Sequence, residues 1–390
     1  MVGIINVFSD NNIGDFAIVM TRIKLESKKI KLFSVYNSFQ GKFTTQHRKF
    51  SNFQIHSNPY GELGIDFENK LIRYFSKVFH FGILIFRFIL EFYFYKVFNL
   101  KTSFIKQLEI CDKVYYKGGS VFESNGTIAN IISLIRSYFL IKIISSTGAY
   151  IIFDPQSYGP FRGVLSHIYF SKIINKADEI HCREAISYRY INMYFPTLNT
   201  ILSPDIVFKY PLKKFKIKKT NSLGLTLVST DRLNNDLYIS VIKKLIILYL
   251  DLLKINHVTI IRQVDLSDFD GKEIKLEDYF ISFLRSKKIG FTVIKNIDSV
   301  ESAVKIYSQL DFLIATRLHS SILAFLASTP FLCIEYQGFK ARGTFQLLGF
   351  PLRVFKLQNL STKFNNEKAI FESLIQNSDI TNYLIANEKI

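Results

Sequence analysis

The chain has 390 residues, of which 48% are hydrophobic and 21% are charged, and this length predicts two domains of about 150 to 200 residues each. The composition excludes a disordered or a collagen-like protein. The net charge of +18 is compatible with a nucleic acid, an anionic membrane surface or a phosphorylated substrate as partner. It is equally compatible with a compositional bias toward Lys, Ile, Asn and Phe.

The cysteines and the first residues bear on the compartment. Cys111, Cys182 and Cys333 are an odd number at wide spacing without a CxxC pair, which favours neither a disulfide framework nor a zinc site. The opening MVGIINVFSD has no basic region followed by an apolar stretch, so no secretory signal is expected there. These features predict a cytoplasmic protein.

The first predicted strand, residues 3–8, is followed by a turn at Asp10 to Asp15 and by a helical pattern. Gly14 in such a turn lets the backbone approach a ligand, and the helix N-terminus offers N–H groups to an anion or a sugar hydroxyl. Asn12 and Asp15 are candidate binding residues, although Asp15 can equally be a helix cap. The turn lacks the glycine spacing of dinucleotide and nucleoside triphosphate sites.

Residues 78–100 are very rich in Phe, Ile and Leu, and charged residues such as Arg87 and Glu91 interrupt them, so we expect no membrane-spanning helix there. Apolar residues cover nearly all sides of the predicted helix. A helix buried in the core is favoured over an aromatic, basic surface that touches a bilayer.

Two further predicted strands, 113–116 and 150–153, end in glycine-containing loops, one with Gly118 and Gly119 and one with Gln156 to Pro160. The carboxyl ends of neighbouring parallel strands lie at the same edge of a sheet, where open α/β sheets bind ligands. Each loop alone is more typical of a simple turn.

Next along the chain, Arg183 follows a strand and precedes a helix that contains Ser187. A guanidinium there can clamp a carboxylate or a phosphate, or can pair with a neighbouring acid.

A lysine-rich segment divides the chain. It contains six lysines between residues 209 and 220, and we place a basic linker at 209–221, an N-terminal domain at 1–208 and a C-terminal domain at 222–390. The C-terminal domain contains predicted strands at 223–228, 257–261, 312–315 and 331–334, separated by helical patterns, which predicts a parallel sheet with helices on both faces.

Arg317 and His319 follow the predicted strand 312–315 and open a helix. Both can face an anion held at the positive end of that helix, and His is suited to proton transfer near neutral pH. As an isolated pair they are equally typical of a structural helix start.

Taken in order, these motifs resemble the polysaccharide pyruvyltransferase family over almost the whole chain. The matching elements are Asn12-Ile13-Gly14-Asp15, Gly118-Gly119, Gln156 to Pro160, Arg183-Glu184 with Ser187, Ser203-Pro204-Asp205, Arg317-Leu318-His319, and Tyr336 with Lys340-Ala341-Arg342-Gly343. The chain departs from the family pattern at Lys117 and Ser124, which stand where Gly and Asp are usual, and at Glu184, which replaces a frequent Asp.

The resemblance implies an α/β, GT-B-like fold, in which two Rossmann-like domains with parallel sheets face each other across a cleft. It implies phosphoenolpyruvate as donor substrate, no other cofactor and no metal, and a saccharide or lipid-linked oligosaccharide as acceptor. The product is then a pyruvate ketal in a capsule or exopolysaccharide. Arg183 and Arg317 can hold the phosphate and carboxylate of this donor, the C-terminal domain is expected to be the donor side, and by similarity His319 protonates the enol methylene.

The same resemblance makes the N-terminal domain the acceptor side. The residues expected to bind substrates are Asn12, Gly14, Asp15, Gly118, Gly119, Gln156, Ser187, Leu318, Tyr336 and Lys340. Two other functions stay open, a GT-B glycosyltransferase that uses a nucleotide sugar and a catalytically silent relative that binds a glycan. Peripheral contact with the inner face of the membrane is also expected, and nucleic acid is not, because the chain contains no module that reads it.

Overall fold

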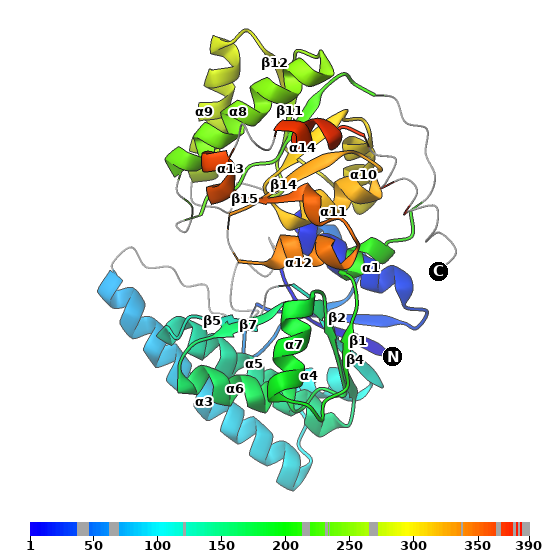
Figure 1. Cartoon of the computed structure of the whole chain (residues 1–390). Coiled ribbons are helices and arrows are strands. Elements are labelled where there is room, and N and C mark those ends of the chain that lie inside the picture. The colour runs from blue at the N-terminus through cyan, green and yellow to red at the C-terminus, as the bar shows by residue number, and fades with distance from the viewer. Residues whose placement is uncertain are drawn as a thin grey trace. The chain divides into compact units, whose positions relative to one another are not determined.

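A computed structural model shows two compact units (Figure 1). It describes residues 1–36, 47–61, 70–119, 122–212, 219–230, 233, 235–264, 272–336, 338–363, 368–376, 380 and 383. Met1–Asp10 and Ile18–Ile206 form the first unit. Asn11–Ala17 and Val207–Ile390 form the second. Residues 213–218 of the predicted basic linker at 209–221 lie outside the described residues.

The first unit is built on a parallel sheet. In the described part of the chain this sheet has seven strands in the order β3-β2-β1-β4-β6-β8-β9, and every pairing is parallel. Its central strands are continuous apolar runs buried on both faces, as expected for a sheet covered by helices. The strands are β1 (Val2–Val7), β2 (Ile30–Ser34), β3 (Ile55–His56), β4 (Lys113–Tyr116), β6 (Tyr150–Gln156), β8 (Glu179–Cys182) and β9 (Thr200–Leu202). A separate pair is formed by β5 (Phe122–Ser124) and β7 (Tyr158–Phe161).

Helices connect these strands and bury their apolar faces against the sheet. Thr102 and Thr127 cap α4 and α5, each accepting a hydrogen bond from a first-turn backbone N–H. The helices are α1 (Ile13–Leu25), α3 (Lys70–Phe98), α4 (Ser103–Glu109), α5 (Ile128–Thr147), α6 (Val164–Ile174) and α7 (Ala185–Tyr194), with a 3-10 turn at Arg48–Phe50.

The second unit contains a parallel sheet of six described strands in the order β12-β11-β10-β13-β14-β15. This order is that of a dinucleotide-type Rossmann fold, in which the chain reverses its direction of travel across the sheet between β10 and β13. The strands are β10 (Leu223–Leu225), β11 (His257–Ile261), β12 (Gly290–Ile294), β13 (Phe312–Ala315), β14 (Phe331–Glu335) and β15 (Val354–Lys356). The helices are α8 (Asn235–Leu253), α9 (Lys272–Ser286), α10 (Val300–Ser308), α11 (Leu318–Leu326), α12 (Lys340–Leu347), α13 (Leu357–Lys363) and α14 (Lys368–Ser373), with 3-10 turns at Ile206–Lys209 and Pro351–Arg353.

The prediction of an α/β fold with two Rossmann-like domains and parallel sheets is confirmed. The predicted strands at 113–116, 257–261 and 312–315 have the bounds of β4, β11 and β13. Sequence analysis missed the edge strands β3, β9, β12 and β15, the separate pair β5 and β7, and the interior strand β2.

The favoured interpretation of residues 78–100 as a helix buried in the core is right for one face of the helix and wrong for the other. Helix α3 buries one face, which includes Leu84, Phe88 and Tyr95, and exposes the other, where Phe86 is 65% accessible. Among the described helices, α5 is by length and composition long and apolar enough to cross a membrane. Its buried residues belong to the core of the first unit, which is the arrangement of a core helix in a globular domain.

Candidate functional site

The strongest candidate site lies at the carboxyl edge of the second unit's sheet, where β10 and β13 are neighbours. Two threonines tie the ends of these strands together. The Thr316 backbone N–H donates to Thr226 Oγ1 over 3.1 Å, and Thr316 Oγ1 donates to the Thr226 carbonyl over 2.7 Å. Both side chains are buried. A switch point of this kind is where open α/β sheets bind their ligands.

Arg317 follows Thr316 as the residue that precedes α11. Its Nε donates to the Leu227 carbonyl over 3.3 Å, and its Nη2 contacts the Glu273 carboxylate. The Ser229 backbone N–H donates to the same carboxylate over 3.2 Å. The Arg317 side chain is 23% exposed, and these contacts hold it beside the N-terminal end of α11.

His319 lies in the first turn of α11 and is half-buried. It packs against Gly14, which belongs to the same unit. A Cβ atom at Gly14 would lie 2.5 Å from His319 Nδ1 and 2.7 Å from His319 Cβ, too close for any side chain. The structure thus brings together two predicted site residues that are 305 positions apart in the sequence, and gives the reason for the glycine.

The turn that carries Gly14 is docked on the end of β11. The Asn12 side-chain oxygen accepts a hydrogen bond from the Gly14 backbone N–H over 3.0 Å, which closes an Asx turn. The Ile13 backbone N–H donates to the Gln263 carbonyl over 3.0 Å, and Asn12 forms an antiparallel bridge with Val264. Asp15 lies in the first turn of α1, as a helix-start acid.

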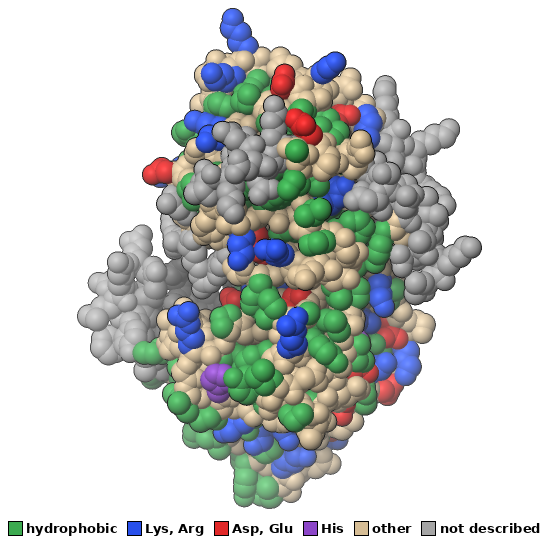
Figure 2. All heavy atoms as spheres, in the orientation of Figure 1, with side chains coloured by type: hydrophobic (Ala, Val, Ile, Leu, Met, Phe, Trp, Pro, Cys, Tyr) green, Lys and Arg blue, Asp and Glu red, His purple; other side chains and the backbone are tan. Residues whose placement is uncertain are grey.

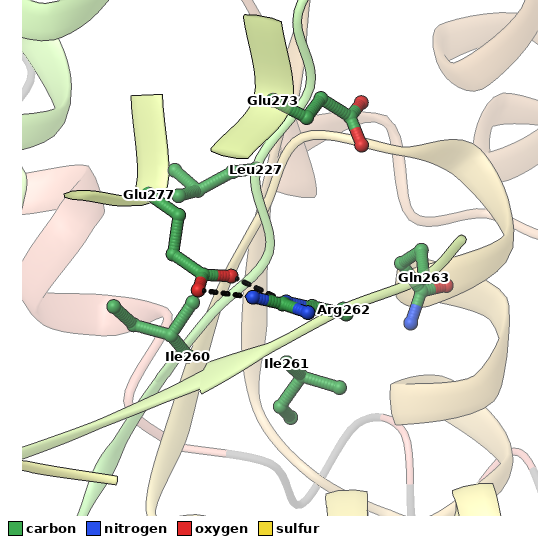
Figure 3. A pocket seen from close by; sticks show the side chains of 7 residues that line it. All are labelled: Leu227, Ile260, Ile261, Arg262, Gln263, Glu273 and Glu277. Atoms are coloured by element: carbon green, nitrogen blue, oxygen red, sulfur yellow. Dashed lines mark hydrogen bonds and ion pairs between the residues drawn. The ribbon is translucent and has the colours of Figure 1, made fainter. Parts of the chain in front are cut away.

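A small hollow of about 10 Å³, the size of one water molecule, opens beside these residues (Figure 3). Its lining consists of Leu227, Ile260, Ile261, Arg262, Gln263, Glu273 and Glu277. Figure 3 shows Glu277 in a two-pronged contact with Arg262, over 2.7 and 2.8 Å. Glu273 and Glu277 lie one turn apart on α9.

Sequence analysis missed these lining residues. Arg262 and Gln263 directly follow the predicted strand at 257–261, so the rule that placed ligands at carboxyl ends of strands applies to them as well. Glu273 and Glu277 carry the spacing of one helix face, which alone does not distinguish a site from a solvated surface.

Arg183 has a different setting from the one expected. It is 1% exposed, and its Nη1 donates to Asp205 over 2.9 Å while its Nε donates to Ser157 Oγ over 3.0 Å. Asp205 is fully buried. Arg183, which follows β8, thus links the turn after β9 through the ion pair and the loop after β6 through Ser157, and this favours a structural role over direct contact with the donor.

The other predicted residues of the first unit form interlocked loops. A Cβ atom at Gly118 would lie 2.5 Å from the Pro155 carbonyl oxygen, so Gly118 allows the loops after β4 and β6 to touch. The Ser157 backbone N–H donates to the Gly119 carbonyl over 3.3 Å. Gln156 is buried and donates to the Tyr158 hydroxyl over 3.1 Å.

Ser187 links the first turn of α7 to this loop. Its Oγ accepts from the Tyr158 backbone N–H over 2.7 Å, and its own N–H donates to Glu184, which caps the helix, over 2.7 Å. Burial raises the pKa of Glu184, and the hydrogen bonds from Ser187 oppose that rise. The predicted residues thus lie together at one edge of the sheet.

The last predicted residues lie in the second unit. Leu318 is the first residue of α11, Tyr336 follows β14 and packs on the core of this unit, and Lys340 opens α12. Glu335, which sequence analysis missed, accepts from the Arg342 backbone N–H over 3.1 Å, and burial raises its pKa. Within the described ranges, no group of three or more His, Cys, Asp or Glu side chains is placed to hold a metal ion.

Comparisons with known proteins agree with this architecture. A family model described as polysaccharide pyruvyl transferase matches residues 25–338. Arg183, Arg317 and His319 lie within the matched residues, and the turn at residues 12–15 precedes them. No curated protein sequence matches the chain.

Solved structures resemble the chain at low identity. The Anabaena protein HepE, solved in complex with UDP, has a TM-score of 0.51 at 8% identity and covers 100% of this chain and 97% of its own. UDP-GlcNAc 2-epimerase from Methanocaldococcus jannaschii has a TM-score of 0.52 at 10% identity, with 95% and 91% covered. The enzyme of that name from Neisseria meningitidis, bound to UDP-GlcNAc, has a TM-score of 0.51 at 9% identity and 99% coverage of both chains. These likenesses show a GT-B-type fold.

Proposed function

The chain belongs to the polysaccharide pyruvyl transferase family, and from this premise we propose that it moves a pyruvyl group from phosphoenolpyruvate to a sugar of a cell-surface polysaccharide or of its lipid-linked precursor. The product is a pyruvate ketal across two sugar hydroxyls, and phosphate is released. The observation that carries the proposal is the pair Arg317 and His319 at the N-terminal end of α11.

The donor's charges fit this position. Phosphoenolpyruvate carries a phosphate and a carboxylate, and a helix N-terminus at a switch point favours anions through its dipole and its backbone N–H groups. Arg317 adds a fixed cation that can grip either group in two parallel hydrogen bonds. Arg317 contacts the Glu273 carboxylate in this structure. When the donor binds, its anionic group therefore either replaces that carboxylate at the guanidinium or binds beside it.

His319 supplies the proton. In the proposed reaction its imidazolium protonates the methylene carbon of the donor, which makes the neighbouring carbon electron-poor. One acceptor hydroxyl adds to that carbon, and a second forms another C–O bond as the bond to phosphate breaks. Each hydroxyl gives up one proton, so one returns to His319 and the other leaves with the phosphate. The close packing of Gly14 fixes the imidazole for this step.

The acceptor is proposed to use the loops of the first unit that carry Gly118, Gly119, Gln156 and Ser187. Their interlocking hydrogen bonds support a rigid sugar-binding edge, because hydroxyl recognition needs polar groups held at fixed positions. Arg183, buried on Asp205, is proposed to hold this edge together instead of touching the donor.

The test measures phosphate release and donor binding separately. We expect His319→Ala to lower phosphate release by about 10² to 10⁴-fold while phosphoenolpyruvate still binds in calorimetry. Arg317→Ala should weaken that binding. His257→Ala is the matched control, because His257 begins β11 at the opposite end of the strand from Arg262. Full turnover of His319→Ala contradicts its role as the acid.

The same titration separates the alternatives. The likeness to proteins solved with UDP or UDP-GlcNAc keeps a nucleotide-sugar glycosyltransferase open. Binding of UDP-sugars without binding of phosphoenolpyruvate would favour that alternative, and glycan binding without turnover would favour a silent relative.

We also propose a cytoplasmic location, since the three cysteines are buried and free, as suits a reducing compartment.

A further inference from the structure

Helix α3 presents an apolar outer face. Ten large apolar side chains on it and just after it are between 38% and 68% exposed, namely Phe79, Ile83, Phe86, Ile89, Leu90, Tyr93, Phe94, Val97, Phe98 and Leu100. Contiguous apolar surface of this extent is uncommon on a soluble monomer and marks a binding surface. We call this set the α3 outer face.

The inner side of α3 fixes how the outer face is presented. Phe88 stacks on Phe139 of α5 with ring centroids 4.0 Å apart. The Tyr60 hydroxyl donates to Glu91 over 2.7 Å, and the Tyr95 hydroxyl donates to Glu109 over 3.0 Å. The helix therefore lies on its unit with the outer face turned to solvent.

The charges around this face have one sign. In sequence, α3, α5 and α6 together carry eight Lys or Arg residues and one acid, Glu91. Glu91 is buried on the inner side, where Tyr60 and Thr102 donate to it and where Arg87 Nε lies 3.8 Å from its carboxylate. Arg87 and Lys96 are exposed beside the apolar side chains. The surface is therefore complementary to an anionic partner with an apolar layer.

Basic side chains also lie over aromatic rings next to the α3 outer face. Lys142 Nζ is 4.7 Å from the Phe92 ring centroid, and Lys172 Nζ is 5.2 Å from that of Tyr169. Aromatic rings with adjacent ammonium groups are typical of protein surfaces at the level of lipid headgroups.

Neighbouring helices of the same unit also expose apolar side chains. Contacts of Phe88 with Phe139 and of Tyr95 with the Ser146 carbonyl show that α3 and α5 run in the same direction. The first turns of α5 and α6 expose Ile128, Val164, Leu165 and Ile168. Figure 2 shows hydrophobic and basic side chains intermixed over the lower part of the view, where Figure 1 places helices of this unit.

We infer that the α3 outer face binds the surface of an anionic lipid bilayer as an interfacial helix. A second copy of the chain fits less well, because a two-fold contact through this face would bring Arg87 and Lys96 of both copies together without an exposed acid on the helix to pair with them. An interfacial helix buries its apolar residues below the headgroups while its cations meet anionic lipids. The inference does not depend on the proposed reaction.

The chain has no Trp, which allows a reporter without background. Phe86→Trp places one on the α3 outer face, and Leu352→Trp places one in the second unit at a position with the same 65% exposure. With vesicles of phosphatidylcholine and phosphatidylglycerol, we expect a blue-shifted emission for Phe86→Trp and no shift for Leu352→Trp. Equal shifts, or none in a folded Phe86→Trp protein, would overturn the inference.

Co-sedimentation then measures the strength of attachment. We expect the triple variant Phe86→Ser, Phe94→Ser, Val97→Ser to bind these vesicles at least tenfold more weakly, whereas Ile247→Ser with Leu352→Ser binds as the parent does. Lys96→Ala should weaken binding by about fivefold on anionic vesicles only. Equal binding to neutral and anionic vesicles overturns the electrostatic part. If the triple variant changes from dimer to monomer in light scattering while its vesicle binding is unaltered, a second copy covers the α3 outer face and the membrane inference is overturned. No donor or acceptor is present, so failure here leaves the pyruvyl-transfer proposal untouched.

Discussion

Replacing Gly14 by Ala tests most directly whether the packing of Gly14 against His319 matters for activity. The added Cβ would lie 2.5, 2.6 and 2.7 Å from His319 Nδ1, Cγ and Cβ. Ordinary carbon contacts begin near about 3.5 Å, so His319 and Gly14 must separate by roughly 1 Å. The overlap includes His319 Cβ, which is fixed to α11, so turning the ring cannot relieve it. The backbone at Gly14 is outside the left-handed region, which leaves His319 as the cause of the strain.

A displacement of about 1 Å in a catalytic group can lower the rate about hundredfold, and overpacking costs about 1 to 3 kcal/mol of unfolding free energy. We therefore expect kcat/KM for phosphate release to fall about hundredfold in Gly14→Ala, with the protein still folded in a thermal melt. Gly82→Ala is the matched control, because no atom lies within 4 Å of its Cβ position and Ala favours the helix.

The double variant Gly14→Ala, His319→Ala sharpens this test. If the glycine acts through the imidazole, the double variant loses no more activity than His319→Ala alone. Parental activity of Gly14→Ala, in an assay where His319→Ala is inactive, would refute the view that this packing positions the proton donor. If the activity losses of the two single variants multiply in the double variant, Gly14 has a role separate from that of His319.

Two further predictions concern stability. Arg183→Met should lower the unfolding free energy by about 3 to 5 kcal/mol in denaturant titrations, because it leaves Asp205 buried without its cation; an effect below 1 kcal/mol would contradict a structural ion pair. Burial lowers the pKa of His47 to about 4 from 6.5, so folding favours the neutral imidazole. The resulting contribution to the unfolding free energy is present above pH 6.5 and is lost as the pH falls toward 4. We expect about 3 kcal/mol of acid destabilisation from this group and a flatter pH profile for His47→Gln; identical profiles would show that His47 does not titrate in this way.

The architecture was predictable where burial leaves a clear pattern. A strand covered on both faces, such as β4 or β13, is a continuous apolar run, and its bounds follow from the sequence. The edge strand β12 is only partly buried and has no such run. The burial of helix α3 was not predictable, because the sequence does not distinguish an apolar residue on an exposed face from one in a core.

The site was predictable as a set of loops but not as a set of contacts. Position at strand ends indicated Gly14, Arg183 and His319. Sequence does not show that Gly14 packs on His319, because that contact joins residues 305 positions apart. Nor does it show that Arg183 is buried on Asp205, since an exposed and a buried arginine read alike. Long-range packing decides both.

Residues Asn11–Ala17 group with the second unit, although the residues before and after them group with the first. The N-terminal half of the polypeptide therefore contributes one segment to the second unit. A fragment that starts at Val207 lacks the Ile13–Gln263 hydrogen bond and the glycine against His319. Chimeras between members of this family that keep the second unit intact need two segments from the same parent, the stretch from Asn11 to Ala17 as well as everything after Ile206.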